Sequence, residues 1–292
     1  MNLTSPSQVK AWCIENGFHP NKVLGQNFLI DQNALKAIVD AGLEGAAAGG
    51  GLETGDGRRE AGGLETGDGS RGLRVLEIGP GLGVLTEEML KRGCRVTAIE
   101  KDPVLAARLK ESLGDPEGLT VIAGDALEVI AKPSVFGLRP ADFTRMVSNL
   151  PYQAGTRILL DLVQTRELKS MTVLVQTEVA ERLAAREGTK ARGLAGVWAQ
   201  LDYDVRIVRK VSASCFWPRP EIGSRVVRLD RHDRNGALTE EERKLFHRLT
   251  KQAFEHRRKQ LGSIFKDMIQ STARAEELSN EDWIQLVKGL IG

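Results

Sequence analysis

The chain has 292 residues, of which 41% are hydrophobic and 27% are charged, and its formal net charge is only +2. This length fits one large domain or two smaller ones, and the composition is that of a soluble globular protein with no membrane-spanning stretch. Three dispersed cysteines, four histidines and the absence of a visible signal peptide predict a cytoplasmic protein without a metal site.

An unusual segment covers residues 45–72, after the first core helix. The sequence GGLETGDG occurs at 50–57 and again at 62–69, and the segment contains almost no large apolar residue. It cannot bury enough surface to offset its ordering entropy, so we expect a flexible Gly-rich insertion. The repeated Asp and Gly could suggest a calcium loop, but the array of carboxylates that such a loop needs is missing.

Apolar strands then alternate with helical patterns. The predicted strands are Arg74–Ile78, Arg95–Glu100, Leu119–Ile122, Arg145–Ser148 and Met171–Gln176, followed by Val205–Val211 and Arg225–Leu229 as a possible antiparallel pair. Helical patterns run from the first strand through Leu90, over Leu105–Leu113, and from the fifth strand through Ala185. This alternation predicts an α/β fold, a Rossmann-like, mostly parallel sheet of seven strands.

A smaller helical region begins near His232, where Thr239 and Glu242 form a capping box. We therefore expect a first domain over 1–231, which contains the sheet, and a C-terminal helical domain over 232–292. Between Arg243 and Lys266 there are eight Lys or Arg residues and one acidic residue, Glu255. Such a run is usually a solvated helix face, but it is also the footprint of an RNA-binding surface.

Four strand ends carry polar or Gly residues: Gly79, Glu100, Asp125 and Asn149. They are 21, 25 and 24 residues apart, about one βα unit each, so they should line one edge of one sheet. A carboxylate at Glu100 could accept both hydroxyls of a ribose, and Asp125 could accept from an adenine amino group. Alternatively, Glu100 has no ligand and is simply a solvated charge at the end of a strand.

The sequence of the glycine-rich turn Glu77–Gly83 helps to decide between two candidate ligands, a dinucleotide and S-adenosylmethionine. A dinucleotide site would need G-x-G-x-x-G, whereas position 84 is Val, and Pro80 removes an N–H donor. The pattern fits S-adenosylmethionine better. The turn after the fourth strand, Asn149-Leu150-Pro151-Tyr152, cannot continue a sheet and is inert in most proteins.

Seven motifs together give the chain a close resemblance to a known family. They are LGQNFLID at 24–31, EIGPGLGVLT at 77–86, GDA at 124–126, NLPY at 149–152, QTEVAERLAA at 176–185, CFWPRPEIGS at 215–224 and FEHRRKQL at 254–261. Over nearly its whole length, the chain resembles the small-subunit ribosomal RNA adenine N6-dimethyltransferases. The insertion departs from the family pattern, and KARG at 190–193 lacks the Tyr often found before that Gly.

The resemblance implies a function and a set of roles. The implied activity is S-adenosylmethionine-dependent N6,N6-dimethylation of two adjacent adenines near the 3′ end of 16S rRNA, in a small subunit or its precursor. Cofactor contacts are implied for Asn27, Leu29, Gly79, Glu100, Asp125 and Asn149, and target-base contacts for Asn149, Leu150, Tyr152 and Phe216. On the residues alone, Phe216 with Trp217 could instead pack under a loop, and the segment 26–29 could be a polar turn.

The resemblance implies that the turn Asn149-Leu150-Pro151-Tyr152 is a clamp for the target adenine, and its residues suggest how it would act. The N6 lone pair of adenine is delocalised into the ring, and hydrogen bonds to the Asn149 side-chain oxygen and the Leu150 carbonyl would localise it. Tyr152 offers a stacking face, and positioning should supply much of the rate without a strong general base. Two rival functions remain: a large-subunit methyltransferase that confers macrolide resistance, and a non-catalytic RNA-binding assembly or transcription factor. We expect a monomer.

Overall fold

The computed structural model describes residues 2–21, 24–45, 72–139, 142–234 and 238–291. The insertion predicted at 45–72 therefore falls almost entirely outside the described residues. Its helices are α1 (Pro6–Glu15), α2 (Gln32–Leu43), α3 (Val84–Lys91), α4 (Pro103–Ser112), α5 (Ala126–Ala131), α6 (Gly155–Thr165), α7 (Thr177–Leu183), α8 (Leu194–Asp202), α9 (Glu240–Glu255), α10 (Leu261–Phe265) and α11 (Asn280–Ile291). In the described part of the chain, no helix is both long and apolar enough to cross a bilayer.

The strands form one large sheet and one small one. They are β1 (Phe28–Leu29), β2 (Arg74–Ile78), β3 (Arg95–Glu100), β4 (Leu119–Ala123), β5 (Arg145–Asn149), β6 (Ser170–Gln176), β7 (Tyr203–Val211), β8 (Phe216–Trp217) and β9 (Ser224–Arg231). The large sheet has seven strands in the order β4-β3-β2-β5-β6-β9-β7. Its first five strands are parallel, and β9 pairs antiparallel with both β6 and β7. The predicted sheet and its terminal antiparallel pair are confirmed.

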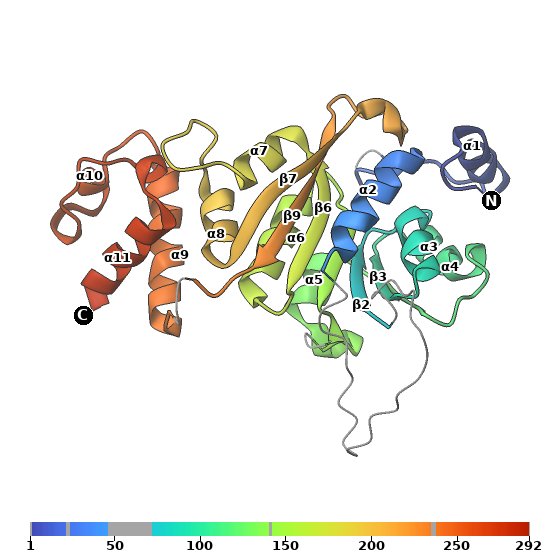
Figure 1. The fold of residues 1–292 in the computed structure, drawn as a ribbon, viewed down its shortest axis with the longest axis horizontal. Coiled ribbons are helices and arrows are strands. Elements are labelled where there is room, and N and C mark those ends of the chain that lie inside the picture. Colours follow the sequence, from blue (N-terminus) through green and yellow to red (C-terminus); the bar gives the residue numbers. More distant parts are fainter. Residues whose placement is uncertain (1, 22–23, 46–71, 140–141, 235–237, 292) are drawn as a thin grey trace, which may run out of the picture.

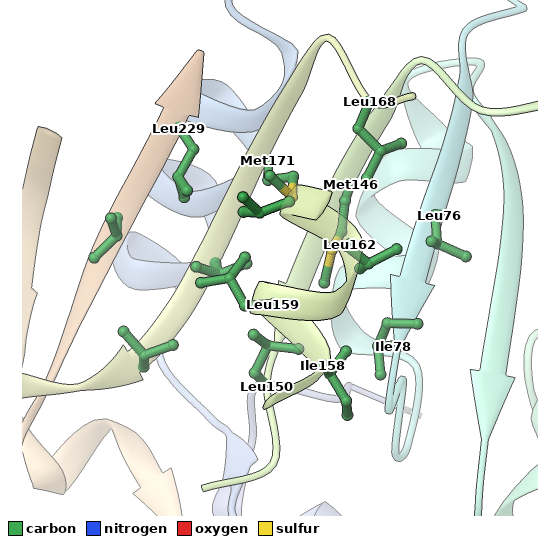
Figure 2. Packing of buried hydrophobic residues seen from close by; sticks show 14 of the residues in the cluster. Leu76, Ile78, Met146, Leu150, Ile158, Leu159, Leu162, Leu168, Met171 and Leu229 are labelled. Carbon is green, nitrogen blue, oxygen red and sulfur yellow. The ribbon is translucent and has the colours of Figure 1, made fainter. Parts of the chain in front are cut away.

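Helices cover both faces of this sheet (Figure 1). Alternating residues of β5 show why: Met146 belongs to one buried apolar cluster and Val147 to the other. The first cluster packs α6 against the sheet, and Figure 2 shows Leu159 and Leu162 of α6 lying over Met146 and Met171. Leu159 is fully buried, so truncating it to Ala would cost about 2–5 kcal/mol. The second cluster places α2, α3 and α4 on the opposite face.

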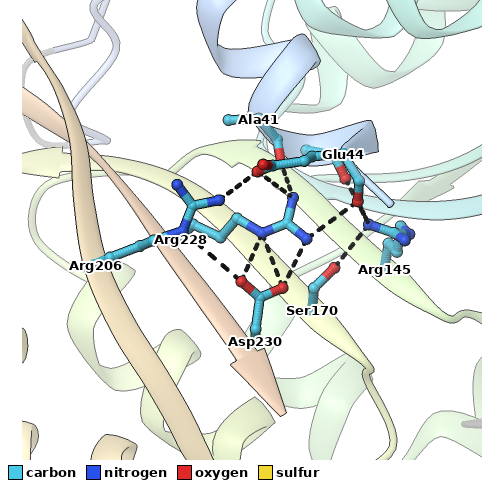
Figure 3. Close-up of polar contacts among 8 residues, drawn as sticks. Ala41, Glu44, Arg145, Ser170, Arg206, Arg228 and Asp230 are labelled. Atoms are coloured by element: carbon cyan, nitrogen blue, oxygen red, sulfur yellow. Dashed lines mark hydrogen bonds and ion pairs between the residues drawn. The ribbon is translucent and has the colours of Figure 1, made fainter. Parts of the chain in front are cut away.

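Two arginines hold the C-terminal end of α2 on the sheet (Figure 3). Arg228 of β9 is buried; it donates to the carbonyls of Ala41 and Glu44 and pairs with Asp230 at 2.6 Å. Arg145 of β5 donates to the Glu44 carbonyl at 2.8 Å. Cations are favourable at a helix C-terminus, where carbonyls lack partners inside the helix. The network fixes the helix that follows the N-terminal segment of the site.

The two-residue strands β1 and β8 were not predicted from the sequence. They pair antiparallel, with Leu29 opposite Phe216 and Phe28 opposite Trp217. Phe28 also packs in an apolar cluster with residues of α1, and its ring stacks on Trp217 with centroids 6.5 Å apart. This small sheet joins the N-terminal segment to the chain just before β9, and so places residues 24–29 beside the large sheet.

The helices α9, α10 and α11 gather at the end of the molecule opposite α1, α3 and α4 (Figure 1). They share an apolar cluster that includes Phe246 and Trp283, together with Val197 and Leu201 of α8. The predicted capping box is present, because Thr239 and Glu242 exchange their side-chain-to-backbone hydrogen bonds. A domain boundary at 231/232 stays a prediction, since α8 contributes to the C-terminal cluster.

Candidate active site

A cavity of about 180 Å³ lies at the carboxyl ends of β2, β3, β4 and β5. Its lining includes the four strand-end residues predicted from the sequence, namely Gly79, Glu100, Asp125 and Asn149, and also Asn27, Leu29, Leu150 and Tyr152. These residues come from five separate segments, and the strand order β4-β3-β2-β5 makes their ends adjacent. The spacing argument therefore located the cavity correctly.

The glycine-rich turn after β2 approaches the cavity with its backbone. Gly79 and Gly81 have φ angles of 65° and 59°, a region that L side chains rarely adopt. A Cβ at Gly81 would also lie 3.1 Å from the Phe28 ring. The N–H of Gly81 donates to Glu100 Oε2 at 3.0 Å, and the N–H of Asp102 donates to Oε1 at 2.9 Å. Glu100 thus holds the turn in place while it lines the cavity.

Glu100 and Glu77 are both buried carboxyls. Burial raises the pKa of Glu100, and the N–H bonds from Asp102 and Gly81 oppose that shift. Burial raises the pKa of Glu77 further, to about 8, against the hydrogen bond from the Thr86 hydroxyl at 2.6 Å. Glu77 lines the cavity, but sequence reasoning treated it only as part of the Gly-rich motif. The sequence shows that Glu77 precedes Gly79, but it does not show that the Glu77 side chain is buried.

Asp125 takes two roles at the end of β4. Its Oδ1 accepts the N–H of Leu127 at 2.9 Å and caps α5, and its Oδ2 pairs with Lys101 Nζ at 2.7 Å. The hydrogen bond from Lys101 lowers the pKa of Asp125. Lys101 was missed from sequence, because nothing local indicates that it would pair with a strand end 24 residues away.

The side-chain amide of Asn149 is oriented by the N-terminal segment. Its Nδ2 donates to the Asn27 carbonyl at 3.2 Å. Because a carbonyl can only accept, this contact places the amide nitrogen toward Asn27 and leaves Oδ1 as an acceptor. Within the described residues, no N–H donates to the Leu150 carbonyl, which is the second acceptor of the predicted clamp. Both acceptors belong to the cavity wall.

Tyr152 is half-buried at the same wall, and its hydroxyl lies 2.9 Å from Ser224 Oγ in β9. Burial raises the pKa of Tyr152, so its phenol stays neutral. Behind it, Gly25 has a φ of 67°, and a Cβ there would lie 3.1 Å from the Tyr152 nitrogen. Ser224 and Gly25 were not among the predicted site residues; only their place inside two of the motifs pointed to them.

Phe216 is the one predicted site residue that the structure does not bring to the cavity. It is 2% exposed and packs in the apolar cluster of Leu29 and Val211. Successive side chains of a strand point to opposite faces, so Phe216 enters the core while Trp217 lies against Phe28. Of the two aromatic side chains expected to bracket a base, Tyr152 lines the cavity and Phe216 is buried beside Leu29, so the base contact of Phe216 stays a prediction.

The basic run at 243–266 also divides into two kinds of residue. Arg243 is buried and forms a bidentate pair with Asp202 at 2.8 and 2.9 Å, and Arg257 donates to the Lys190 carbonyl at 2.7 Å. Lys244 pairs with Glu240 at 3.6 Å on the surface. Among the side chains that the structure describes, which do not include that of Asp267, the exposed cations without an ion pair are Arg248, Lys251, Arg258, Lys259 and Lys266.

In the described residues, no group of three or more His, Cys, Asp or Glu side chains is arranged to hold a metal ion. The three cysteines are free thiols.

Comparison with known proteins places the chain among ribosomal RNA methyltransferases by sequence. A family model described as ribosomal RNA adenine dimethylase matches residues 17–288. A ribosomal RNA small subunit methyltransferase A from Deinococcus radiodurans is 42% identical over 229 residues, which is 78% of this chain and 67% of that protein. One from Rhodococcus opacus is 37% identical over 281 residues, or 94% of this chain and 85% of that protein.

Among solved structures, a dimethyladenosine transferase from Plasmodium falciparum has the same fold. It superimposes with a TM-score of 0.68 at 21% identity and covers 90% of this chain and 97% of that chain. At this level of identity the likeness concerns the arrangement of sheet and helices.

Proposed function

This chain belongs to the ribosomal RNA adenine dimethylase family, and we propose that it dimethylates N6 of two adjacent adenines near the 3′ end of 16S rRNA. The methyl donor would be S-adenosylmethionine, which supplies an electrophilic methyl group on a sulfonium. The observation that carries the proposal is the Asn149 amide, whose orientation is fixed by Asn27 at the rim of a cavity lined by Glu100 and Asp125.

The cavity fits a nucleoside donor in three respects. Gly79 and Gly81 line the cavity without a Cβ of their own, so their backbone can approach a ligand closely. Glu100 offers two carboxylate oxygens that can accept ribose hydroxyls in addition to their N–H bonds. Asp125 stays ionised beside Lys101 and can accept from an adenine amino group. Asn27 and Leu29 would close the same cavity from the N-terminal side.

The clamp residues would act on the target adenine. Asn149 Oδ1 and the Leu150 carbonyl would accept the two N6 hydrogens and so favour a tetrahedral nitrogen whose lone pair faces the methyl carbon. The Tyr152 ring, held by Ser224, would stack on the base; such stacking contributes about 1–3 kcal/mol. A nitrogen–carbon bond forms, the sulfur–carbon bond breaks, and one N6 proton leaves to solvent after each transfer. Orientation would supply much of the rate.

We further propose that the chain works as a monomer in the cytoplasm, on a small ribosomal subunit or its precursor. The names of its relatives refer to small-subunit rRNA. The free cysteines fit a reducing compartment. The exposed cations of α9 and the α10 region would contact RNA phosphates.

The test is to incubate the purified chain with isotope-labelled S-adenosylmethionine and unmethylated small subunits, and in parallel with large-subunit rRNA. The proposal expects dimethyladenine at two adjacent positions near the 3′ end of the small-subunit RNA, mapped by mass spectrometry. Label confined to the large-subunit RNA would favour the resistance-type methyltransferase. RNA binding without any label would favour a non-catalytic assembly factor.

A further inference from the structure

A second hollow, of about 290 Å³, lies within the C-terminal helices and takes no part in the cavity described above. Its walls come from α9 and from the end of α10 with the 3₁₀ turn Lys266–Met268 that follows it. The lining residues are Arg248, Leu249, Gln252, Ile264, Phe265, Lys266 and Met268.

The floor of this hollow is apolar. Leu249 and Phe265 are buried members of the C-terminal cluster, and Ile264 packs against them. Met268 stands at its edge with 52% of its surface exposed, which makes it one of the few large apolar side chains left open in the described chain. A methionine is adaptable and favours contact with flat aromatic surfaces.

The polar lining residues of the hollow are two cations, Arg248 and Lys266, and one amide, Gln252. Arg248 and Lys266 are exposed, and among the side chains that the structure describes, which do not include that of Asp267, neither has a carboxylate at ion-pair distance. Arg243, five residues before Arg248 on the same helix, is by contrast buried against Asp202. Gln252, one turn beyond Arg248, adds a donor and an acceptor.

The backbone at Lys266 is also unusual. Its φ of 43° lies in a region that L residues rarely adopt. Residues held in such conformations cluster at functional sites, because the surrounding structure must stabilise them. This residue ends α10 and is one of the two cations of the hollow.

We propose that this hollow seats one unpaired nucleotide of the RNA substrate, with the base on Met268 and the apolar floor and the flanking phosphates on Arg248 and Lys266. The inference rests on the proposed function, since it takes RNA as the substrate. An unpaired nucleotide combines a flat apolar face, hydrogen-bonding edges and anionic phosphates, and the hollow offers a partner to each. An acidic peptide would meet the cations but would bring no flat face to the floor.

The helices that form the seat stand at one end of the molecule, and α8, β7, β9 and β6 lie between them and β5 and β2, whose ends line the catalytic cavity (Figure 1). The seat would therefore bind RNA at a distance from the target adenine. A nucleotide held there fixes the register of the RNA on the enzyme, whereas the other free cations would hold the phosphate backbone without regard to register.

The test uses the full chain and a hairpin RNA that carries one bulged nucleotide, compared with the same hairpin fully paired. Fluorescence anisotropy across a salt series gives both affinities and both salt slopes. Met268→Ser should reduce the preference for the bulged hairpin by about tenfold, within the range of one base stack, and leave the salt slope unchanged. Arg248→Gln and Lys266→Gln should each lower the preference and also reduce the slope by about 1.

Lys251→Gln is the matched control, because Lys251 is an exposed cation on the same helix outside the hollow. It should reduce the salt slope and leave the preference for the bulge intact. Thermal melting checks that each variant is folded, and Met268→Ala provides a milder replacement. Wild-type preference in folded Met268→Ser and Met268→Ala would overturn the seat, as would competition for it by a polyglutamate peptide as strong as by the bulged RNA.

Failure of the seat and failure of the proposed function give different results. If the wild-type chain methylates rRNA but the bulge preference does not depend on Met268, the seat is wrong and the function stands. If the preference depends on Met268 but no methyl group is transferred, the function is wrong and the seat remains. S-adenosylmethionine affinity should be unchanged in all hollow variants.

Discussion

The catalytic cavity and the C-terminal helices use their charged groups in opposite ways. In the cavity, Glu100 accepts two backbone N–H bonds and Asp125 is paired with Lys101. In the C-terminal region, Arg258 and Lys259 are exposed and have no ion pair within the described ranges. A preorganised site suits a small ligand that must be aligned to fractions of an ångström, whereas free surface cations suit a polyanion whose binding weakens with salt.

The largest effect expected on the cavity side is that of Asn149→Ala. Removing one oriented acceptor at the reacting nitrogen should lower turnover by about 10²–10³-fold, by analogy with the loss of one preorganised hydrogen-bonding group in other enzymes. Cofactor affinity should change much less, because Glu100 and the glycine turn are intact. Single-turnover kinetics and calorimetry on the same preparation measure the two quantities. A loss of affinity as large as the loss of rate would show that Asn149 mainly binds the cofactor.

Glu100→Ala should mainly reduce cofactor affinity and affect turnover at saturating cofactor less. Loss of its charged hydrogen bonds should weaken S-adenosylmethionine binding by about 1–3 kcal/mol, and Glu100→Gln, which keeps one acceptor, should lose less. Because Gly81 and Asp102 donate to Glu100, the Ala variant should also melt earlier. Calorimetry that finds unchanged affinity would remove Glu100 from the ribose role.

Buried carboxyls make the cavity side sensitive to pH. The pKa of Glu77 is raised from 4.5 to about 8 in the folded chain, so folding takes up a proton between these values. Stability is therefore fully present below pH 4.5 and falls as pH rises toward 8, by about 1.4 kcal/mol per pH unit at most. Glu77→Gln should flatten this slope in denaturant melts. An unchanged slope would mean that Glu77 is ionised in the folded state.

The smallest effect concerns the Tyr152 hydroxyl. Tyr152→Phe and Ser224→Ala each remove a hydrogen bond of 2.9 Å, which is worth about 1 kcal/mol, while the stacking face remains. Both variants should keep much of the activity, whereas Tyr152→Ala should lose more. Weakened clamps should also accumulate monomethyladenine, because the second transfer has one fewer N–H to hold. If Tyr152→Phe is as inactive as Tyr152→Ala, the hydroxyl has a role beyond anchoring the ring.

The sequence predicted those site residues whose positions follow from the order of strands and helices along the chain. Strand ends one βα unit apart had to meet, so Gly79, Glu100, Asp125 and Asn149 were placed together without any contact being known. Ser224 was missed because its contact with Tyr152 depends on the antiparallel pairing of β9 with β6.

Phe216 and Arg243 are both buried where a cavity-lining or exposed position was expected, because the direction of a side chain depends on packing. Phe216 lies in a two-residue strand, and nothing in the sequence indicated which of Phe216 and Trp217 would face the core. Arg243 was counted among the surface cations, yet it is buried on the face of α9 that also carries Phe246 and Thr250. That spacing of three and seven residues was a signal that Arg243 faces inward.

One measurement tests the central division of labour: single-turnover methyl transfer as a function of RNA concentration, at saturating cofactor, for Asn149→Ala and for the double variant Arg258→Gln with Lys259→Gln. The cavity variant should remain slow at every concentration, since its defect lies in the reacting complex. The Arg258→Gln, Lys259→Gln variant should need more RNA to saturate, and its RNA binding should depend less on salt. At saturation it should reach the wild-type rate. Dimethyladenine formed at the normal rate by Asn149→Ala would contradict the mechanism.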